Sequence, residues 1–128
     1  MAGYSKKGLE KRKKEREGYA EFYQSHVYFV KKNRVKCEEC GSQLQGHVSE
    51  IAHILPKQKY KSIAKEDKNI LYLCGMYSKN QCHSKFDDSK AEVIKQMNVY
   101  DKAVDRFKKL EEKITENISY KTYDKWEK

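Results

Sequence analysis

The stretch CEECGSQLQGHVSEIAHILP, residues 37–56, decides the fold. Two residues separate Cys37 from Cys40, and Gly41 follows directly. Two thiolates at this spacing can reach one metal ion, and a glycine after them lets the backbone turn tightly. The pattern predicts a metal-binding knuckle at the start of the stretch.

Two further cysteines, Cys74 and Cys82, bring the total to four. Four thiolates around zinc form a closed tetrahedral structural site with no open position for chemistry. Seven residues separate Cys74 from Cys82, where about two to four are usual. This pair is therefore also compatible with ordinary buried thiols or with a redox pair. We favour a single zinc site made by all four cysteines.

The composition is that of a small, highly charged chain. The 128 residues suit one domain, the mean hydropathy is −1.05, and charged residues make up 37% of the chain. Such a unit buries only a modest core, so a structural zinc, worth about 10–16 kcal/mol in small metal-folded units, is favoured. No stretch approaches the roughly 18 apolar residues of a membrane span, and no apolar segment follows the basic N-terminus. We expect a cytoplasmic protein with no membrane partner and with reduced thiols.

The net charge of +9 is concentrated at the N-terminus. Residues 1–36 contain eleven Lys or Arg against four Glu, whereas residues 37–128 contain seventeen against fifteen acidic residues. Basic side chains that neutralise phosphates release counterions, so such a segment favours nucleic acid without reading its sequence. A solubilising tail is the alternative. The candidate nucleic-acid contacts are Lys6, Lys7, Lys11, Arg12, Lys13, Lys14 and Arg16.

The hydrophobic pattern predicts one α+β domain over residues 19–118, after a basic, flexible arm over residues 1–18. Residues 119–128 stay unassigned. His26 lies on the apolar stripe of the first helix and is interpreted as a packed or partly exposed histidine, and His47 as a loop residue. The expected elements are an amphipathic helix over 19–32, a hairpin within 37–56, a surface loop over 57–68, a strand over 69–74, a helix from Cys82 to about Met97, and a last helix from Asn98 through Ile114. Asn98, with Asp101 three residues later, is close to a capping box at the start of that last helix.

Three blocks follow the cysteine knuckle: IAHILPK with His53, NILYLC with Asn69, and CHSKFD with His83 and Asp87. In this order they resemble the HNH, or ββα-metal, endonucleases. The resemblance covers residues 37–87, under half of the chain. It implies a small ββα-metal core stapled by the four-cysteine zinc site and flanked by N- and C-terminal helices.

The resemblance also implies roles for these residues in cutting DNA, with RNA left open as a substrate. His53 matches the general base, because a histidine can take a proton from water at neutral pH. Asn69 matches the residue whose amide fixes the loop and so orients His53. His83 matches a ligand of a catalytic ion, typically Mg²⁺ or Mn²⁺ and sometimes Zn²⁺, that is distinct from the structural zinc.

The sequence departs from the family pattern in two places. Ala52 stands before the general base, where Asp or His often binds the catalytic ion, and about five extra residues lie between Cys74 and Cys82. Asp87 lies four residues after His83, so both would face one ion from a helix. Glu50 could also reach that ion, although a solvated glutamate is the simpler expectation.

Two other functions stay open. A catalytically silent zinc module that only binds nucleic acid agrees with Ala52. A purely structural or protein-binding zinc domain would use the aromatic tail and the helical stripes. The enzyme is the preferred interpretation, because the three blocks occur together and in order.

Overall fold

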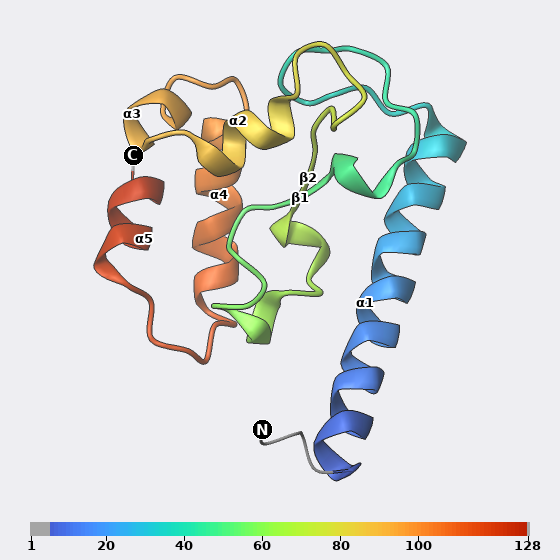
Figure 1. The fold of residues 1–128 in the computed structure, drawn as a ribbon. Helices are drawn as coiled ribbons and strands as arrows, with labels where there is room; N and C mark the ends of the chain where they lie inside the picture. Colours follow the sequence, from blue (N-terminus) through green and yellow to red (C-terminus); the bar gives the residue numbers. More distant parts are fainter. Residues whose placement is uncertain (1–5, 128) are drawn as a thin grey trace.

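The computed structural model describes the backbone of residues 6–127 and the side chains of residues 13, 14 and 16–127. A long helix, α1 (Lys6–Asn33), runs along one side of the molecule, and its first turns extend past the rest of the domain (Figure 1). Residues 6–18, expected as an arm, are thus continuous with the predicted 19–32 helix. Lys, Arg and Glu are strong helix formers, and no proline interrupts them. The first five residues of the predicted arm lie outside the described part.

The sheet consists of two short strands, β1 (Ile51–His53) and β2 (Ile70–Tyr72). They pair antiparallel, with Ala52 opposite Leu71 and His53 opposite Ile70. The strand predicted over 69–74 is confirmed at its centre. The hairpin predicted within 37–56 is wrong, because β1 pairs with β2 and not with an earlier part of that stretch. The one other bridge in the stretch joins Gln43 to Lys36 in the described residues.

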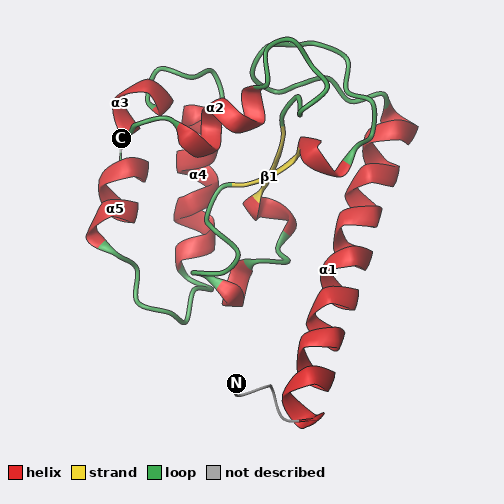
Figure 2. Cartoon of the chain, in the orientation of Figure 1, coloured by secondary structure: helices red, strands yellow, loops and turns green. Residues whose placement is uncertain are grey.

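The connections around the sheet are mostly loops and single turns of 3₁₀ helix (Figure 2). One turn, η1 (Val48–Glu50), precedes β1, and two more, η2 (Lys61–Ile63) and η3 (Asp67–Asn69), lie between the strands. The surface loop predicted over 57–68 therefore contains short helical turns. They bring the chain back so that β2 can pair with β1.

The single helix predicted from Cys82 to Met97 is two helices, α2 (Cys82–Asp88) and α3 (Ala91–Ile94). Ser89 and Lys90 separate them in extended conformation, with ψ of 154° and 159°. Asp and Ser compete with the helical backbone through their own side chains. The run Asp87, Asp88, Ser89 accordingly ends α2.

The last predicted helix is α4 (Tyr100–Glu111), and the unassigned tail forms α5 (Tyr120–Trp126). The predicted cap at Asn98 is wrong, because the residue before α4 is Val99 and no side chain caps the helix. Asn98 Nδ2 instead donates to Glu39 O at 2.9 Å and ties α4 to the cysteine knuckle. Ser119 caps α5 by accepting a hydrogen bond from Thr122 N.

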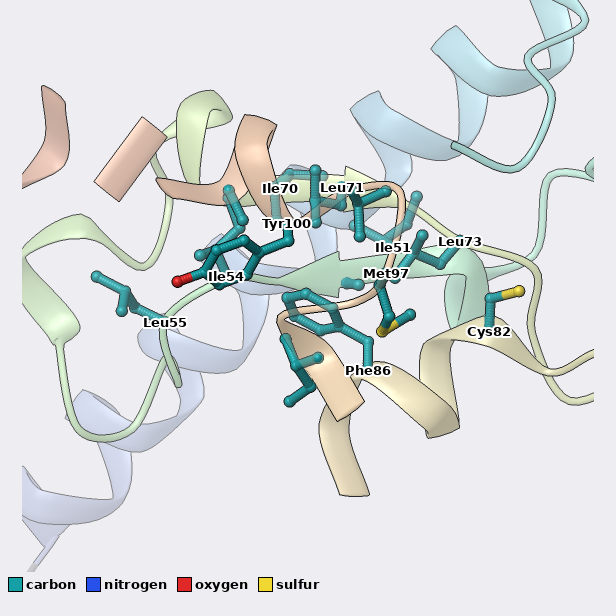
Figure 3. Packing of buried hydrophobic residues seen from close by; sticks show 14 of the residues in the cluster. Ile51, Ile54, Leu55, Ile70, Leu71, Leu73, Cys82, Phe86, Met97 and Tyr100 are labelled. Carbon is teal, nitrogen blue, oxygen red and sulfur yellow. The ribbon is translucent and has the colours of Figure 1, made fainter. Parts of the chain in front are cut away.

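The core lies between the sheet and helices α2, α3 and α4. Phe86 from α2 points toward the strands and packs among Ile54, Met97 and Tyr100 (Figure 3). Trp126 of α5 is only 2% exposed, and its ring stacks on Phe86 at 5.7 Å. The C-terminal helix therefore holds α2 against the sheet.

Candidate functional site

The four cysteines come together at one end of the molecule, where the loop after α1 meets the loop after β2 (Figure 1). All four Sγ atoms lie within 4.8 Å of one another, and Cys40 Sγ is 3.8 Å from Cys74 Sγ. Tetrahedral zinc with Zn–S bonds of about 2.3 Å requires sulfurs roughly 3.8 Å apart. The predicted four-cysteine cluster is confirmed as a group positioned to hold a metal ion, and it is compatible with structural zinc.

Backbone amides point at the cysteine sulfurs. Cys74 N donates to Cys37 Sγ and Cys82 N donates to Cys74 Sγ, each at 3.3 Å. Burial opposes ionisation of Cys40, but hydrogen bonds from Ser42 and Asn80 outweigh it and lower the pKa of that thiol to about 6. Such bonds stabilise thiolates, the form that binds zinc. The thiol pair considered for Cys74 and Cys82 is not a disulfide, because all four cysteines are free.

The knuckle has the backbone conformation that its sequence predicts. Gly41 has a φ of +78°, which glycine adopts without strain, and its N–H donates to Cys37 O at 2.9 Å. The other two ligands sit where regular elements end and begin: Cys74 is two residues past β2, and Cys82 is the first residue of α2. The cluster thus joins the first loop, the sheet and α2.

His53, the last residue of β1, has a fixed orientation. Its Nε2 lies 3.0 Å from Ala64 O. Because a carbonyl oxygen only accepts hydrogen bonds, Nε2 donates the proton, and Nδ1 of the neutral ring is the basic nitrogen. Burial lowers the pKa of His53 below its ordinary value, and Lys57 adds to this effect while the bond to Ala64 opposes it. The ring is therefore neutral at pH 7 with Nδ1 able to accept a proton.

Asn69 is fully buried and clamps the chain just after His53. Its Oδ1 accepts from Leu55 N at 2.8 Å, and its Nδ2 donates to Leu55 O at 3.0 Å. Asn69 O also accepts from Ile54 N at 2.8 Å. These three bonds fix the backbone of the two residues that follow His53.

His83 and Asp87 lie one turn apart on α2 and contact each other. His83 Nε2 is 3.0 Å from Asp87 Oδ2, and His83 Nδ1 is 2.5 Å from Ser49 O. Burial lowers the pKa of His83, but the bonds to Asp87 and Ser49 outweigh it and raise the pKa overall. The charges of His83 and Asp87 also act on His53, so α2 presents a histidine and a carboxylate within electrostatic reach of that ring.

Glu50 is neither solvated nor directed at a metal site. The residue is 5% exposed, and its carboxylate accepts hydrogen bonds from the backbone N–H groups of Gln45, Gly46 and His47 at 2.7–2.9 Å. The expectation that it could reach the catalytic ion is wrong, because both oxygens hold the loop before β1. His47 is a loop residue as predicted, and its Nδ1 accepts from Ser49 N.

His26 is a packed residue, as its place on the helical stripe predicts. It is 6% exposed, and its Nδ1 lies 2.7 Å from Tyr72 Oη. Burial raises the pKa of Tyr72 to about 12, so this phenol keeps its proton and can donate it to Nδ1. His26 Nε2 then faces Asp67 Oδ1 at 3.0 Å, an ion-pair distance without the alignment of a hydrogen bond.

The basic residues predicted to contact nucleic acid all belong to α1. Lys13, Lys14 and Arg16 have exposed side chains. The side chains of Lys6, Lys7, Lys11 and Arg12 lie outside the described part. No acidic residue occupies the first turn of α1, so its N-terminal end combines basic side chains with the positive end of the helix dipole.

The sequence did not reveal the residues that orient the two histidines. Ser49 and Ala64 act through backbone carbonyls, which every residue type has, so their identities do not predict this role. Gly75 gives a weak signal, because a Cβ there would lie 2.1 Å from Ser49 Oγ and glycine is needed for the loop to approach. That loop contains the extra residues 76–80, and Met76 N donates to Ser49 Oγ at 3.3 Å.

Comparison with known proteins gives no relative for this chain: no protein-family profile, no curated protein and no solved structure matches it. Within the described residues, no helix is both long enough and apolar enough to span a membrane. What the structure establishes is a small α+β fold with a four-cysteine cluster suited to a metal ion.

Proposed function

We propose that the protein is a metal-dependent endonuclease of the HNH type that hydrolyses DNA phosphodiester bonds, with His53 as the general base. The main support is the orientation of His53. Its Nε2–H is held by Ala64 O, which leaves Nδ1 as the basic nitrogen. The Asn69 clamp on Leu55 fixes the backbone behind it, as a catalytic base requires.

In the proposed step, His53 Nδ1 accepts a proton from a water molecule while the water oxygen forms a bond to phosphorus. The bond between phosphorus and the leaving sugar oxygen breaks, its electron pair goes to that oxygen, and a proton from solvent completes the new hydroxyl. The products are a phosphomonoester and a free hydroxyl. General base catalysis of this kind contributes about 10²–10⁴-fold in rate.

His83 and Asp87 would hold the catalytic divalent ion. Bound there, a Mg²⁺ or Mn²⁺ ion would act as a Lewis acid on the scissile phosphate. Donation of His83 Nδ1–H to Ser49 O would leave Nε2 free as a ligand beside Asp87 Oδ2. Magnesium often takes only one or two protein ligands and completes its shell with water and phosphate, so the buried Ala52 does not prevent binding.

The basic helix α1 would bind the DNA backbone. Lys13, Lys14 and Arg16 are exposed on a rigid element whose later turns contact His53 through Phe22 and Tyr23. Phosphate contacts from such a helix would orient the duplex without selecting its sequence. The residues nearer the N-terminus extend the same positive charge.

A catalytically silent nucleic-acid-binding zinc module is the second candidate. Ala52 favours it, since this buried residue offers no ligand where the family often has one. In addition, among the described residues the four cysteines are the only cluster of three or more metal-ligating side chains. A silent module would keep the basic helix and the zinc while lacking the chemistry.

Cleavage of supercoiled plasmid in Mg²⁺ or Mn²⁺ separates the two candidates. The wild-type protein is expected to nick the plasmid, and His53→Ala to lose nicking by at least about 10²-fold with DNA affinity and zinc content unchanged. Added imidazole should restore part of the rate, because it replaces the missing base. A wild-type protein that binds DNA and never cuts it would leave the silent module as the function.

A further inference from the structure

Lys57 occupies an unusual position for a lysine. It is half-buried, its Nζ donates to Tyr23 Oη at 3.0 Å, and Nζ lies 5.0 Å from the ring centroids of both Tyr19 and Tyr23. The ring of Tyr23 also meets the ring of His53 edge-on at 5.9 Å. A single tyrosine therefore separates a fixed ammonium group from His53.

Lys65 reaches the same place from the other side of the connecting loop. Its Nζ lies 5.1 Å from the centroid of Tyr19. Lys65 Nζ also lies close to the backbone of Gly18, where a Cβ would be 2.4 Å from it. Both ammonium groups lie about 5 Å from the centroid of the Tyr19 ring, so they are at most about 10 Å apart, about one Debye length at 0.1 M salt.

Neither lysine forms an ion pair with any carboxylate among the described side chains. Other lysines do: Lys102 pairs with Glu38, and Lys113 with Glu66. The aromatic rings hold Lys57 and Lys65 in place, each contact being worth about 0.5–2 kcal/mol, without neutralising their charge. Two unneutralised cations within about 10 Å of each other repel, and an anion that contacts both would relieve the repulsion.

We propose that Lys57 and Lys65, held on the aromatic face of α1, form a subsite for a phosphodiester of the nucleic-acid strand whose neighbouring phosphate lies at His53. This inference rests on the proposed function for the position of the strand. Arg16 lies three residues before Tyr19 on the same face of α1 and is exposed. Among the described side chains, positive charge thus runs from Arg16 to Lys65 and Lys57, and one tyrosine ring separates Lys57 from His53.

The test is the salt dependence of DNA binding, measured by fluorescence anisotropy on the full chain without added Mg²⁺ or Mn²⁺. Each phosphate contact contributes about 0.9 to the slope of log K against log salt on duplex DNA and about 0.7 on a single strand. Because the two lysines share one phosphodiester, the double variant Lys57→Gln with Lys65→Gln should lose about 0.9 of the duplex slope. Lys57→Arg with Lys65→Arg should keep it, since both charges remain.

Lys108→Gln is the matched control, because it removes one exposed lysine on α4, on the other side of the sheet from α1 (Figure 1). The subsite is overturned if the salt slope of the double variant equals the slopes of wild type and of Lys108→Gln. It is also overturned if the wild-type protein binds no DNA. Equal thermal unfolding midpoints and zinc contents show that the variants are folded. If the double variant loses slope but the wild-type protein never cuts DNA, the subsite stands and the proposed nuclease activity is wrong. If the wild-type protein cuts DNA but the double variant keeps its slope, the nuclease stands and the subsite is wrong.

Inorganic phosphate distinguishes a strand from a free anion. Titrated alone and followed through the NMR signals of the tyrosine rings, it is expected to bind without saturation at millimolar concentrations. Tight, saturable binding of phosphate that the double variant abolishes would assign the pair to a free anion and overturn the strand subsite.

Discussion

The two clusters of reactive side chains in this protein are built in opposite ways. The cysteine cluster has four identical donors, three of them buried, drawn together within 4.8 Å. The group of His53, His83 and Asp87 does not converge on one metal position as the cysteines do. Its mixed donors are partly exposed, and backbone carbonyls hold both of its rings. Four thiolates fill a tetrahedron, whereas His83 and Asp87 would take only two positions around an ion and would leave the others for water and phosphate.

Both clusters include residues of helix α2. Cys82 and His83 are neighbours at the start of α2, and His83 N donates to Cys74 O at 3.1 Å. A metal ion on the cysteines would therefore fix the end of α2 that presents His83. We propose that the two clusters divide the work, with the closed cluster maintaining the fold and the open cluster serving the chemistry of the proposed nuclease.

The largest expected effect comes from removing the closed cluster. Cys37→Ser, or zinc removal with a chelator, should unfold the chain, because a structural zinc contributes about 10–16 kcal/mol in small metal-folded units. Circular dichroism and elemental analysis check this, with about one zinc per folded wild-type chain expected. A folded, soluble wild-type sample without zinc would contradict the role given to the cysteines.

Removing the support of α2 should have the next largest effect. The ring of Trp126 is buried against Phe86 and Tyr100, at centroid distances of 5.7 and 5.9 Å. Trp126→Ala should lower the free energy of unfolding by about 3–5 kcal/mol in a denaturant titration. Tyr120→Ala is the control, since Tyr120 is 82% exposed and should change it by less than about 0.5 kcal/mol. Similar values for the two variants would show that α5 does not hold α2.

Breaking the clamp behind His53 should cost somewhat less. Asn69→Ala leaves the N–H and C=O of Leu55 buried without their partners, at about 1–3 kcal/mol for each group. The unfolding free energy should fall by at least about 2 kcal/mol, the lower end for two groups, while zinc content stays the same. Gln58→Ala, at an exposed position of the same loop, should be nearly silent. An Asn69→Ala protein as stable as wild type would remove the clamp from the account.

Local patterns predicted the closed cluster, and three sequence blocks predicted the residues of the open one. The spacing of Cys37, Cys40 and Gly41 determines a knuckle within five residues, so its geometry could be anticipated. The assignment of His53, Asn69 and His83 depended on resemblance. Their mutual geometry comes from the pairing of β1 with β2 and from the carbonyls of Ser49 and Ala64, which residue type does not encode.

The parts that the sequence did not predict depend on distant contacts. Trp126 packs against Phe86 and Tyr100, which lie far back along the chain. The sequence of the tail alone therefore does not predict the helix α5. A solvated Glu50 is the simplest expectation from sequence, but η1 turns its carboxylate into the preceding loop. Such errors arise wherever the tertiary fold, rather than local spacing, selects the partner.

The smallest expected effect is a change in the pH dependence of stability. Burial lowers the pKa of His26 below 6.5, although Asp67 opposes this. As the pH falls below about 6.5, the unfolded chain therefore binds a proton that the folded chain refuses, and stability is lost. His26→Gln should flatten the stability curve between about pH 7 and 5 relative to wild type. A steeper curve for the variant would contradict a lowered pKa of His26 in the folded chain.

One pair of measurements on Asp87→Ala tests the separation of the two clusters most directly. Zinc content and plasmid nicking are determined on the same sample, with Asp88→Ala as the control, because Asp88 is exposed and next to Asp87 but is not paired with His83. Asp87→Ala is expected to keep its zinc and to lose nicking in Mg²⁺, with partial recovery in Mn²⁺, while Asp88→Ala cuts like wild type. Full activity of Asp87→Ala, or loss of zinc together with activity, would contradict a closed structural cluster beside an open catalytic one.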